Sequence, residues 1–229
     1  VKDADMYGVS HLEIEPWCIV LDKQRYDFTD EQYYHSKLDF ERMNLTTFHT
    51  NLHVFKKLLI EISHPKSLTF LLDANRREHF RSGFDRAFMQ HISGGVQQLH
   101  RGHLISGVKM LKGCGFGLTP SGDDFIAGLL LGLHCLQSIC GRELRHLIDT
   151  VYAASRGTNI FSQTLLSLAK EGLLFESMKQ LITALLWSGE SEVLRGVEGL
   201  CAVGGSSGAD IGTGFFMTVQ PGVDGFRVA

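Results

Sequence analysis

The sequence lacks the features by which several classes of protein are usually recognised. Its five cysteines include no C-x-x-C pair, and its formal net charge is only -3. The absence of paired cysteines argues against a structural zinc site and against a disulfide framework. The small net charge provides no strongly basic surface for nucleic acid or for an anionic membrane. We therefore expect a cytoplasmic chain with neither nucleic acid nor membrane as a partner.

Long apolar runs are also missing. The longest, Phe125 to Leu133, is far shorter than the roughly 20 residues that span a bilayer, and we interpret it as part of a buried helix. No secretory signal pattern is present, and the chain enters strand-like sequence soon after Val1. We expect that residues before Val1 are missing from this sequence.

The composition is that of a globular chain, with 44% hydrophobic and 21% charged residues among 229. Alternating apolar residues between Val9 and Phe28 predict a hairpin or a small sheet, and helical spacing dominates from about Leu52 onward. We predict an α+β protein in which a small N-terminal β-containing part, residues 1–75, packs on a mainly helical part, residues 76–229. Within it, Ser67 to Asp73 is expected to be a strand or a short buried segment, and a long helix around residues 80–99 is expected to break at Gly94 and Gly95.

The most informative stretch is KGCGFGLTPSGDDFIAG, residues 112–128. Its alternate glycines, which include Gly115 and Gly117, allow backbone N–H groups to converge on a ligand. A helix follows, capped either by Thr119 or by Ser121 with a carboxylate three residues later. In both cases the free N–H groups and the positive helix end would bind phosphate or carboxylate. The alternative is a tight turn between two helices.

A second copy of this helix start occurs near the C-terminus. Residues 120–128 and 206–214 share the pattern S-G-x-D-x-x-x-G, in which Asp124 and Asp210 are equivalent. Asp123 and Asp124 at the head of an apolar helix need hydrogen-bond donors or a cation if they are buried. We predict that the two helix starts face each other across a site. The alternative is two independently capped helices with small residues for close packing.

A third polar helix start lies between these two. Thr158 is predicted to cap it, and Ser162 lies one turn further on. Arg156 is suited to a bidentate contact with an oxyanion, although a lone arginine is more often a solvated charge. Cys114 is interpreted as a small loop residue, because a nucleophilic cysteine needs a base within reach.

Two histidine pairs have the spacing of metal ligands on one helix face. They are His49 with His53 and His100 with His103. No third ligand lies at a diagnostic spacing, and a chain with eleven histidines contains such pairs by chance. We interpret all four as surface or core residues.

At the three helix starts the chain resembles the oxamate carbamoyltransferase subunit AllH-like family. The matching patterns are GxGxGLTPSGDD at residues 113–124, T-x3-S-x3-L-x2-A-x2-G at residues 158–172 and G-x-S-S-G-A-D at residues 204–210. They occur in the family's order and cover roughly the C-terminal half. The chain departs from the pattern at Phe116, where a small residue or proline is expected. The resemblance implies carbamoyl transfer between carbamoyl phosphate and oxamate in purine breakdown, together with companion subunits.

These considerations assign a role to each candidate site residue. Asp124 and Asp210 are expected to orient the amide nucleophile or accept its proton, and Asp123 is a candidate for carrying a magnesium ion through water, alone or with Asp124. No other cofactor is expected. The residues expected to bind the small anionic substrates are Gly115, Gly117, Thr119, Ser121, Gly122, Arg156, Thr158, Ser162, Ser206, Ser207 and Gly208.

Two rival functions stay open from the sequence. The chain could be a non-catalytic subunit or a metabolite-binding module in which the aspartates cap and rigidify an interface. It could also be an aspartate-dependent metal hydrolase, which predicts metal-dependent activity of the isolated chain. A homo-oligomer is compatible with each of these functions.

Overall fold

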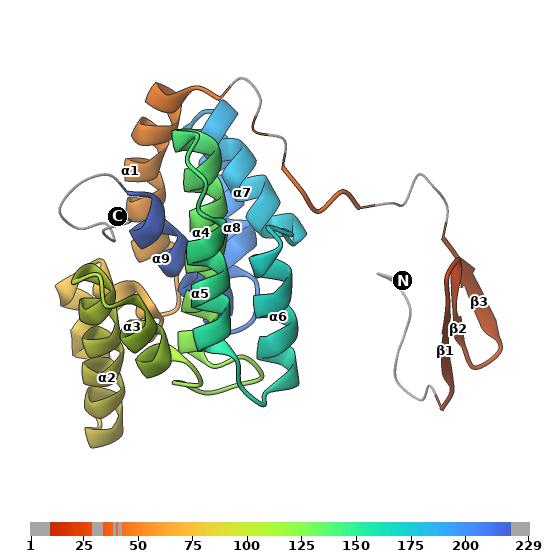
Figure 1. Cartoon of the computed structure of the whole chain (residues 1–229), viewed down its shortest axis with the longest axis horizontal. Coiled ribbons are helices and arrows are strands. Elements are labelled where there is room, and N and C mark those ends of the chain that lie inside the picture. Colours follow the sequence, from red (N-terminus) through yellow and green to blue (C-terminus); the bar gives the residue numbers. More distant parts are fainter. Residues whose placement is uncertain (1–9, 29–33, 39, 41–42, 221–229) are drawn as a thin grey trace. The chain divides into compact units, whose positions relative to one another are not determined.

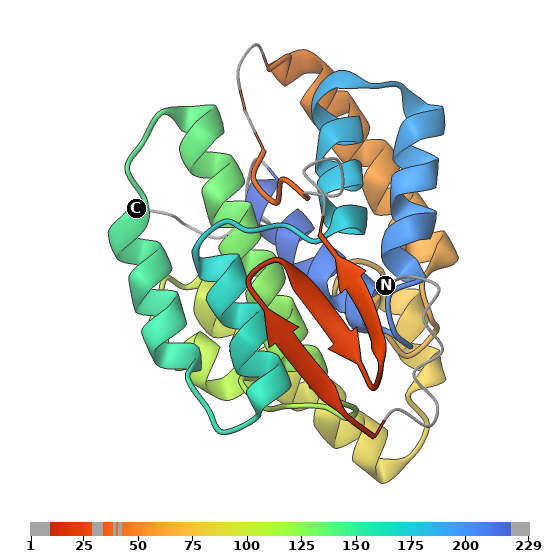
Figure 2. The same ribbon diagram turned by 90° about the vertical axis from the view of Figure 1, so that its right-hand side faces the viewer.

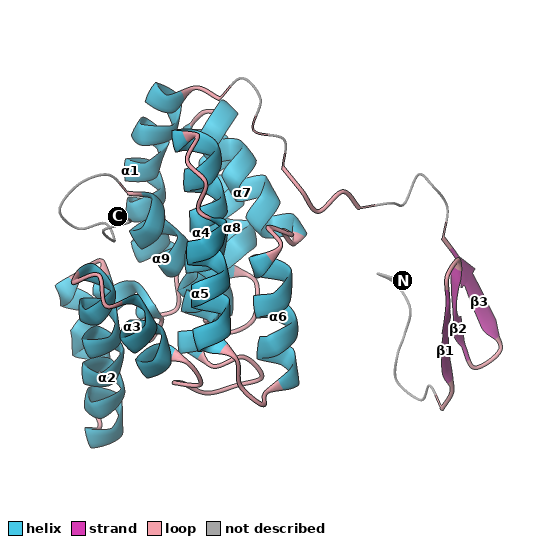
Figure 3. Ribbon diagram, in the orientation of Figure 1, coloured by secondary structure: helices cyan, strands magenta, loops and turns pink. Residues whose placement is uncertain are grey.

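The computed structural model describes residues 10–28, 34–38, 40 and 43–220. The chain divides into two compact units, Val1–His35 and Ser36–Ala229, which we describe separately. The described residues confirm an α+β protein with a mainly helical C-terminal part (Figure 3). The domain boundary expected near residue 75 lies inside the second unit.

The first unit contains a three-stranded antiparallel sheet in the order β1-β2-β3. Its strands are β1 (Leu12–Glu15), β2 (Cys18–Leu21) and β3 (Gln24–Asp27). The turn between β2 and β3 is held by Asp22, whose Oδ1 accepts hydrogen bonds from the backbone N–H groups of Ser10 and His11. The predicted N-terminal sheet is therefore confirmed.

The second unit is helical throughout its described regular elements. Its α-helices are α1 (Leu45–Ile62), α2 (Gly83–His100), α3 (Leu104–Leu111), α4 (Ser121–Cys140), α5 (Arg145–Ser155), α6 (Ile160–Lys170), α7 (Glu176–Trp187), α8 (Glu190–Cys201) and α9 (Ser207–Val219). Two short 3-10 helices, η2 (Leu68–Leu71) and η3 (Ala74–His79), lie between α1 and α2.

Helices α4 and α9 pack side by side in the interior of this unit (Figure 1). Gly128 and Gly214 allow their backbones to meet. A Cβ atom added to Gly128 would lie 1.9 Å from the carbonyl oxygen of Ile211, and one added to Gly214 would lie 2.1 Å from that of Phe125. The small residues therefore permit helix packing at backbone contact distance.

The length and composition of α4 would also allow it to cross a membrane. However, 67% of its apolar window is buried inside the protein, and every residue from Gly122 to Leu133 is buried. An apolar helix that is buried on all sides is typical of a protein core. The structure thus agrees with the interpretation of Phe125 to Leu133 as part of a buried helix.

Helices α1, α7 and α8 pack against one another on the other side of α9 (Figure 2). The buried Asn51 of α1 donates through Nδ2 to the carbonyl oxygens of Ala184, Leu185 and Ser188, at 3.2, 3.2 and 2.9 Å. The Leu185 and Ser188 carbonyl groups lie at the end of α7, where the helix leaves no N–H group for them, whereas the Ala184 carbonyl also accepts from the Ser188 N–H. The bonds join α1 to the end of α7.

Two local expectations are corrected. Of the two expectations for Ser67 to Asp73, the strand is wrong and the short buried segment is confirmed, since Leu68–Leu71 within it forms the buried 3-10 helix η2. A break at Gly94 and Gly95 is also wrong, because α2 runs unbroken to His100. Gly95 instead allows α3 to approach, and a Cβ atom on it would lie 2.9 Å from the Leu111 side chain.

Candidate active site

The two copies of the S-G-x-D-x-x-x-G pattern are brought together as the adjacent starts of α4 and α9. In each copy the first glycine lies against the end of the preceding helix. A Cβ atom on Gly122 would lie 1.9 Å from the Leu111 carbonyl oxygen at the end of α3, and one on Gly208 would lie 1.8 Å from that of Leu200 in α8. The same close approaches occur in both copies, so the sequence repeat corresponds to a structural repeat.

The start of α4 differs from both predicted capping arrangements. The helix begins at Ser121, and Pro120 is its N-cap without a side-chain capping bond. The Gly122 N–H donates to the Cys114 carbonyl oxygen at 2.8 Å, and the N–H groups of Asp123 and Asp124 donate to that of Pro120. The prediction of Thr119 or Ser121 as the cap is therefore wrong. Fewer amide groups are left for an anion than the sequence suggested.

The glycine loop can accept the Gly122 N–H because it turns back onto the start of α4. Gly113, Gly115 and Gly117 all have positive φ, at 69°, 130° and 92°, which residues with a side chain rarely adopt. A Cβ atom on Gly115 would lie 2.5 Å from the Ser121 nitrogen. The alternate glycines are required by the path of the loop.

The serine at each helix start lies beside the aspartate of the other copy. The Ser207 hydroxyl of α9 lies close enough to Asp124 of α4 to lower its pKa, and the Ser121 hydroxyl of α4 does the same for Asp210 of α9. Thr119 links the copies further, because its Oγ1 lies 3.3 Å from Ser207 Oγ. The two helix starts therefore form one polar cluster, which we call the paired helix starts: Thr119, Ser121, Asp124, Ser206, Ser207 and Asp210.

Asp210 is fully buried within this cluster. Its Oδ1 accepts a 2.6 Å hydrogen bond from the Leu68 N–H, and its Oδ2 accepts a 3.0 Å bond from the Ser206 hydroxyl. Burial raises its pKa to about 7, with the nearby Asp124 charge adding to the rise and the hydrogen bonds opposing it. The group is therefore poised to change protonation near neutral pH.

Asp124 lies in a similar environment, but one of its two carboxyl oxygens accepts no hydrogen bond from the described residues. Its Oδ2 accepts from Thr119 Oγ1 at 3.1 Å, whereas its buried Oδ1 has no hydrogen-bond partner among the described residues. Burial raises its pKa to about 6, and the charge of Asp123 contributes to the rise. Buried carboxyl groups with pKa values near neutrality are typical of general acids and bases.

Asp123 has a different role from its neighbour in the structure. It is buried, and its Oδ1 accepts a 2.7 Å hydrogen bond from the Gly113 N–H. This bond fixes the start of the glycine loop. No group of three or more His, Cys, Asp or Glu side chains within the described part of the chain is arranged to hold a metal ion. The expectation of magnesium at Asp123 and Asp124 stays a prediction.

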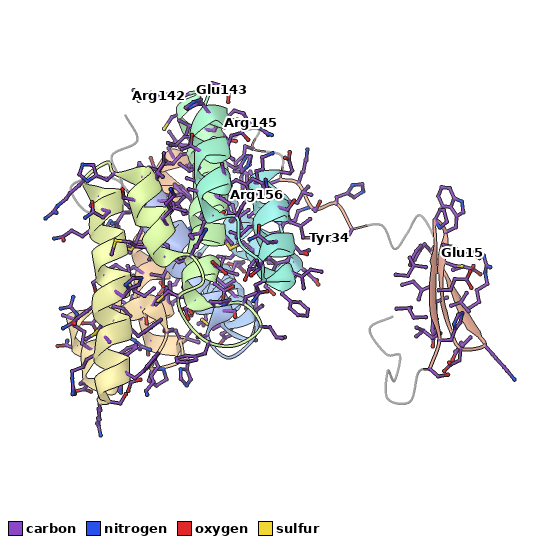
Figure 4. The ribbon with its side chains drawn as sticks, turned by 60° about the horizontal axis from the view of Figure 1, so that its bottom comes forward. Glu15, Tyr34, Arg142, Glu143, Arg145 and Arg156 are labelled. Carbon is purple, nitrogen blue, oxygen red and sulfur yellow. The ribbon has the colours of Figure 1, made fainter. Side chains whose placement is uncertain are left out.

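The predicted anion ligands of the third helix start, Arg156, Thr158 and Ser162, are not among the residues of the paired helix starts. Arg156 is exposed at the end of α5 (Figure 4), and its carbonyl oxygen accepts from Lys112 Nζ at 2.9 Å. Thr158 is exposed and does not cap α6. Ser162 is fully buried, and its hydroxyl has no hydrogen-bond partner among the described residues. The binding roles of these three residues stay predictions.

The true cap of α6 is Asn159, which the sequence analysis missed. Its Oδ1 accepts from the N–H groups of Phe161 and Ser162, at 2.9 and 3.1 Å. Its Nδ2 donates to the Leu118 carbonyl oxygen at 2.8 Å and so ties α6 to the glycine loop. The known preference for asparagine at N-caps could have identified it.

A cavity of about 880 Å³ opens beside the paired helix starts. Its polar residues include Thr119, Asp124, Ser206 and Ser207. Most of the wall is apolar and consists of the following side chains: Phe116, Leu118, Phe161, Leu165, Leu168, Phe175, Val203 and Ile211. Asp124 therefore adjoins a large apolar space.

A smaller cavity of about 240 Å³ lies at Ser121 and shares Phe116, Gly205 and Ser206 with the first. His64 and Lys66 bring basic groups to it. Lys66 Nζ also forms an ion pair with Asp85 at 3.0 Å, and the pKa of Asp85 is lowered to about 2, chiefly by a backbone hydrogen bond from Ser82 and then by Lys66.

Cys114 and the histidine pairs do not add a second reactive centre. Burial raises the pKa of the half-buried Cys114 thiol, and the Asp123 charge raises it further, which disfavours the thiolate needed for nucleophilic attack. His49 and His53 are exposed on α1, and His103 Nδ1 lies 2.8 Å from Gln98 Oε1. The interpretation of Cys114 as a loop residue is supported.

Residues 111–219 match the protein family described as oxamate carbamoyltransferase subunit AllH. This is the family that the three sequence patterns resemble, and the resemblance is confirmed over this segment. The segment runs from the last residue of α3 to the last residue of α9 and includes the paired helix starts. Comparison with curated proteins and with solved structures gives no match.

Proposed function

We propose that this chain, whose residues 111–219 match the AllH family, is a subunit of a carbamoyltransferase and that the paired helix starts form part of its active site. The observation that carries the proposal is the pair Asp124 and Asp210, buried at adjacent helix starts with pKa values raised to about 6 and about 7. The family's name supports carbamoyl phosphate and oxamate as substrates and companion subunits as partners. Purine breakdown in the cytoplasm is the setting we infer.

The reaction requires a nitrogen nucleophile, a carbamoyl donor and a place for one proton. The nitrogen lone pair of the acceptor attacks the carbamoyl carbon and forms an N–C bond. The C–O bond to phosphate breaks, and phosphate leaves with the bonding electrons. The acceptor nitrogen loses a proton, and ionised Asp124 would accept it, because it is the one carboxylate among the described residues that line the large cavity.

The departing phosphate needs donors and positive charge. The smaller cavity supports this role through the Ser121 and Ser206 hydroxyl groups and the side chains of His64 and Lys66, which line it. The Asp85 carboxylate also lines this cavity and pairs with Lys66, so Lys66 would have to turn from Asp85 toward the phosphate. The phosphate would lie beside Ser121 with Gly205 at its edge, while the acceptor occupies the adjoining large cavity. Arg156 is not needed in this arrangement, and we retain it only as a candidate contact in the assembled complex.

One observation favours a non-catalytic alternative. Both oxygens of Asp210 already accept hydrogen bonds within the chain, from Leu68 and Ser206, as they would if the carboxyl group held α9 to η2. In this alternative the chain is a binding or scaffolding subunit, and Asp210 serves only its fold. The unsatisfied Oδ1 of Asp124 is not explained in the same way.

The proposed function is tested by purifying the chain together with its companion subunits and measuring carbamoyl transfer by release of phosphate. Activity should require all subunits and should disappear when this chain is omitted. Full activity without this chain contradicts the proposal. The metal-hydrolase alternative predicts instead that the isolated chain is active when a divalent metal ion is added.

A further inference from the structure

The large cavity adjoins the paired helix starts at one end and α6 along its length. Thr164, Leu165 and Leu168 of α6 line it, together with Phe175 from the segment before α7. Phe116 and Leu118 of the glycine loop are each about 70% exposed and also line it. Its volume of about 880 Å³ lies in the range of cavities that bury drug-sized ligands. Oxamate would leave most of it empty.

At the polar end of the cavity, one carboxyl oxygen of Asp124 has no hydrogen-bond donor among the described residues. Asp124 is 1% exposed, and its Oδ1 has no partner among the described residues. A buried carboxyl oxygen without a hydrogen-bond partner is destabilising, and a ligand that donates a hydrogen bond to it would remove this cost. Thr119 Oγ1 and Ser207 Oγ lie 3.3 Å apart beside it and could accept further bonds.

The charge of the cavity selects against an anion at this end. Among its described lining residues none is lysine, arginine or histidine. A carboxylate placed beside Asp124 would therefore meet a second carboxyl group without a countercharge. A nitrogen that carries two or more hydrogens satisfies Asp124 without this penalty.

We propose that the large cavity binds a primary amide or primary amine that carries an apolar group, with its nitrogen at Asp124 and its apolar body along α6. The inference rests on the proposed function only where this molecule is the carbamoyl acceptor; the binding itself does not require transfer. The observations that carry it are the size and apolar wall of the cavity and the unsatisfied Oδ1 of Asp124. They point to a ligand larger and less polar than oxamate, and where this ligand is the carbamoyl acceptor it takes the place of the oxamate that the family's name gives.

The test is calorimetric titration of the purified chain with three probes of equal chain length, hexanamide, hexylamine and hexanoate, and with acetamide as a short control. At least one nitrogen probe should bind at least tenfold more tightly than hexanoate. If the ligand is an amide, hexanamide should bind at least tenfold more tightly than acetamide, because its longer alkyl chain buries more apolar surface. Binding of only one nitrogen probe identifies the class as amide or amine.

Two variants locate the binding. Asp124→Asn should abolish the preference for nitrogen over carboxylate. Leu168→Gln places a polar group in the apolar wall and should weaken binding of the nitrogen probe at least fivefold. Ser167→Gln, at an exposed position on the same helix, should leave the affinity for this probe unchanged. Circular dichroism confirms that each variant is folded.

The inference is overturned if no nitrogen probe binds the folded chain, if hexanoate binds as tightly, or if Leu168→Gln has no effect. Any of these results would leave the cavity as a surface that a companion subunit fills. Carbamoyl transfer by the complex is measured separately, by release of phosphate. Binding without transfer contradicts only the proposed function, and transfer without this binding contradicts only the present inference.

Discussion

The backbone N–H of Leu68 donates a 2.6 Å hydrogen bond to Oδ1 of Asp210, a residue 142 positions further along the chain. The bond joins the 3-10 helix η2 to the start of α9 and supplies a donor to a carboxyl group that is fully buried. It opposes the effect of burial on the pKa of Asp210, which is nevertheless raised to about 7. The protonation of Asp210 is therefore coupled to folding.

Asp210→Asn should remove a pH dependence of stability. Because the folded pKa of about 7 lies above the ordinary value of 3.8, folding takes up a proton between these values. The stabilisation is fully present below pH 3.8 and is lost as pH rises through about 7. The free energy of unfolding of the unmodified chain should fall relative to that of the variant by up to about 1.4 kcal/mol per pH unit in this window.

Urea unfolding of both proteins at several pH values checks this prediction. Asn retains an acceptor for Leu68 and cannot ionise, so the variant should remain folded. Asp85→Asn is the control of opposite sign, because the lowered pKa of Asp85 contributes stability above its ordinary value that is lost as pH falls toward about 2. Parallel stability curves for the unmodified chain and Asp210→Asn between pH 4 and 7 would show that Asp210 is not buried as described.

Gly128→Ala should strongly destabilise the helical unit. The added Cβ atom would lie 1.9 Å from a backbone oxygen of α9, and α4 and α9 would have to separate. We expect a loss of about 1–3 kcal/mol or more, seen as a lower midpoint in thermal or urea unfolding. Gly214→Ala should behave alike, because its Cβ atom would lie 2.1 Å from the Phe125 oxygen.

Gly199→Ala is the matched control for these two substitutions. Gly199 lies within α8, and its Cβ atom would meet nothing closer than 4.0 Å. Alanine is favoured over glycine inside a helix by roughly 0.5–1 kcal/mol, so this variant should be neutral or slightly more stable. Equal destabilisation by all three substitutions would contradict the close packing of α4 on α9.

Substitutions of Asn159 should separate helix capping from attachment of the glycine loop. Asn159→Ala loses both and should reduce the free energy of unfolding by about 1–2 kcal/mol. Asn159→Asp keeps the acceptor for the N–H groups of Phe161 and Ser162 but loses the donor to the Leu118 carbonyl oxygen. It should retain most of the stability while the loop exchanges its amide hydrogens faster. Unchanged exchange in the loop would show that this bond does not hold it.

Much of the helical fold could be predicted from the sequence because its signals are local. Gly141 and Gly172, which follow α4 and α6, have positive φ, and glycine in this conformation is a sequence signal for the end of a helix. The repeat at residues 120–128 and 206–214 was also visible, since equivalent close approaches require glycine at equivalent positions.

The parts that failed depend on distant contacts. Ser121 resembles a helix cap by sequence, but the structure directs its hydroxyl to Asp210, almost ninety residues away in the chain. Ser67 to Asp73 was expected to be a strand or a short buried segment; it is buried, but Leu68–Leu71 within it forms the 3-10 helix η2, from which the Leu68 N–H donates to Asp210. Arg156 was grouped with the other anion ligands because helix starts were expected to converge. It is exposed at the end of α5, and its binding role stays a prediction.

The central claim is that Asp124 and Asp210 act in carbamoyl transfer, and the most direct test is the transferase activity of the reconstituted complex that contains Asp124→Asn or Asp210→Asn. Asp149→Asn serves as the control, since Asp149 is a half-exposed carboxylate of α5 that pairs with Arg145 and Lys170. We predict that Asp124→Asn lowers kcat at least a hundredfold, that Asp210→Asn lowers it less and shifts the pH profile, and that Asp149→Asn leaves activity unchanged. Full activity of both site variants in a folded and correctly assembled complex would contradict the account.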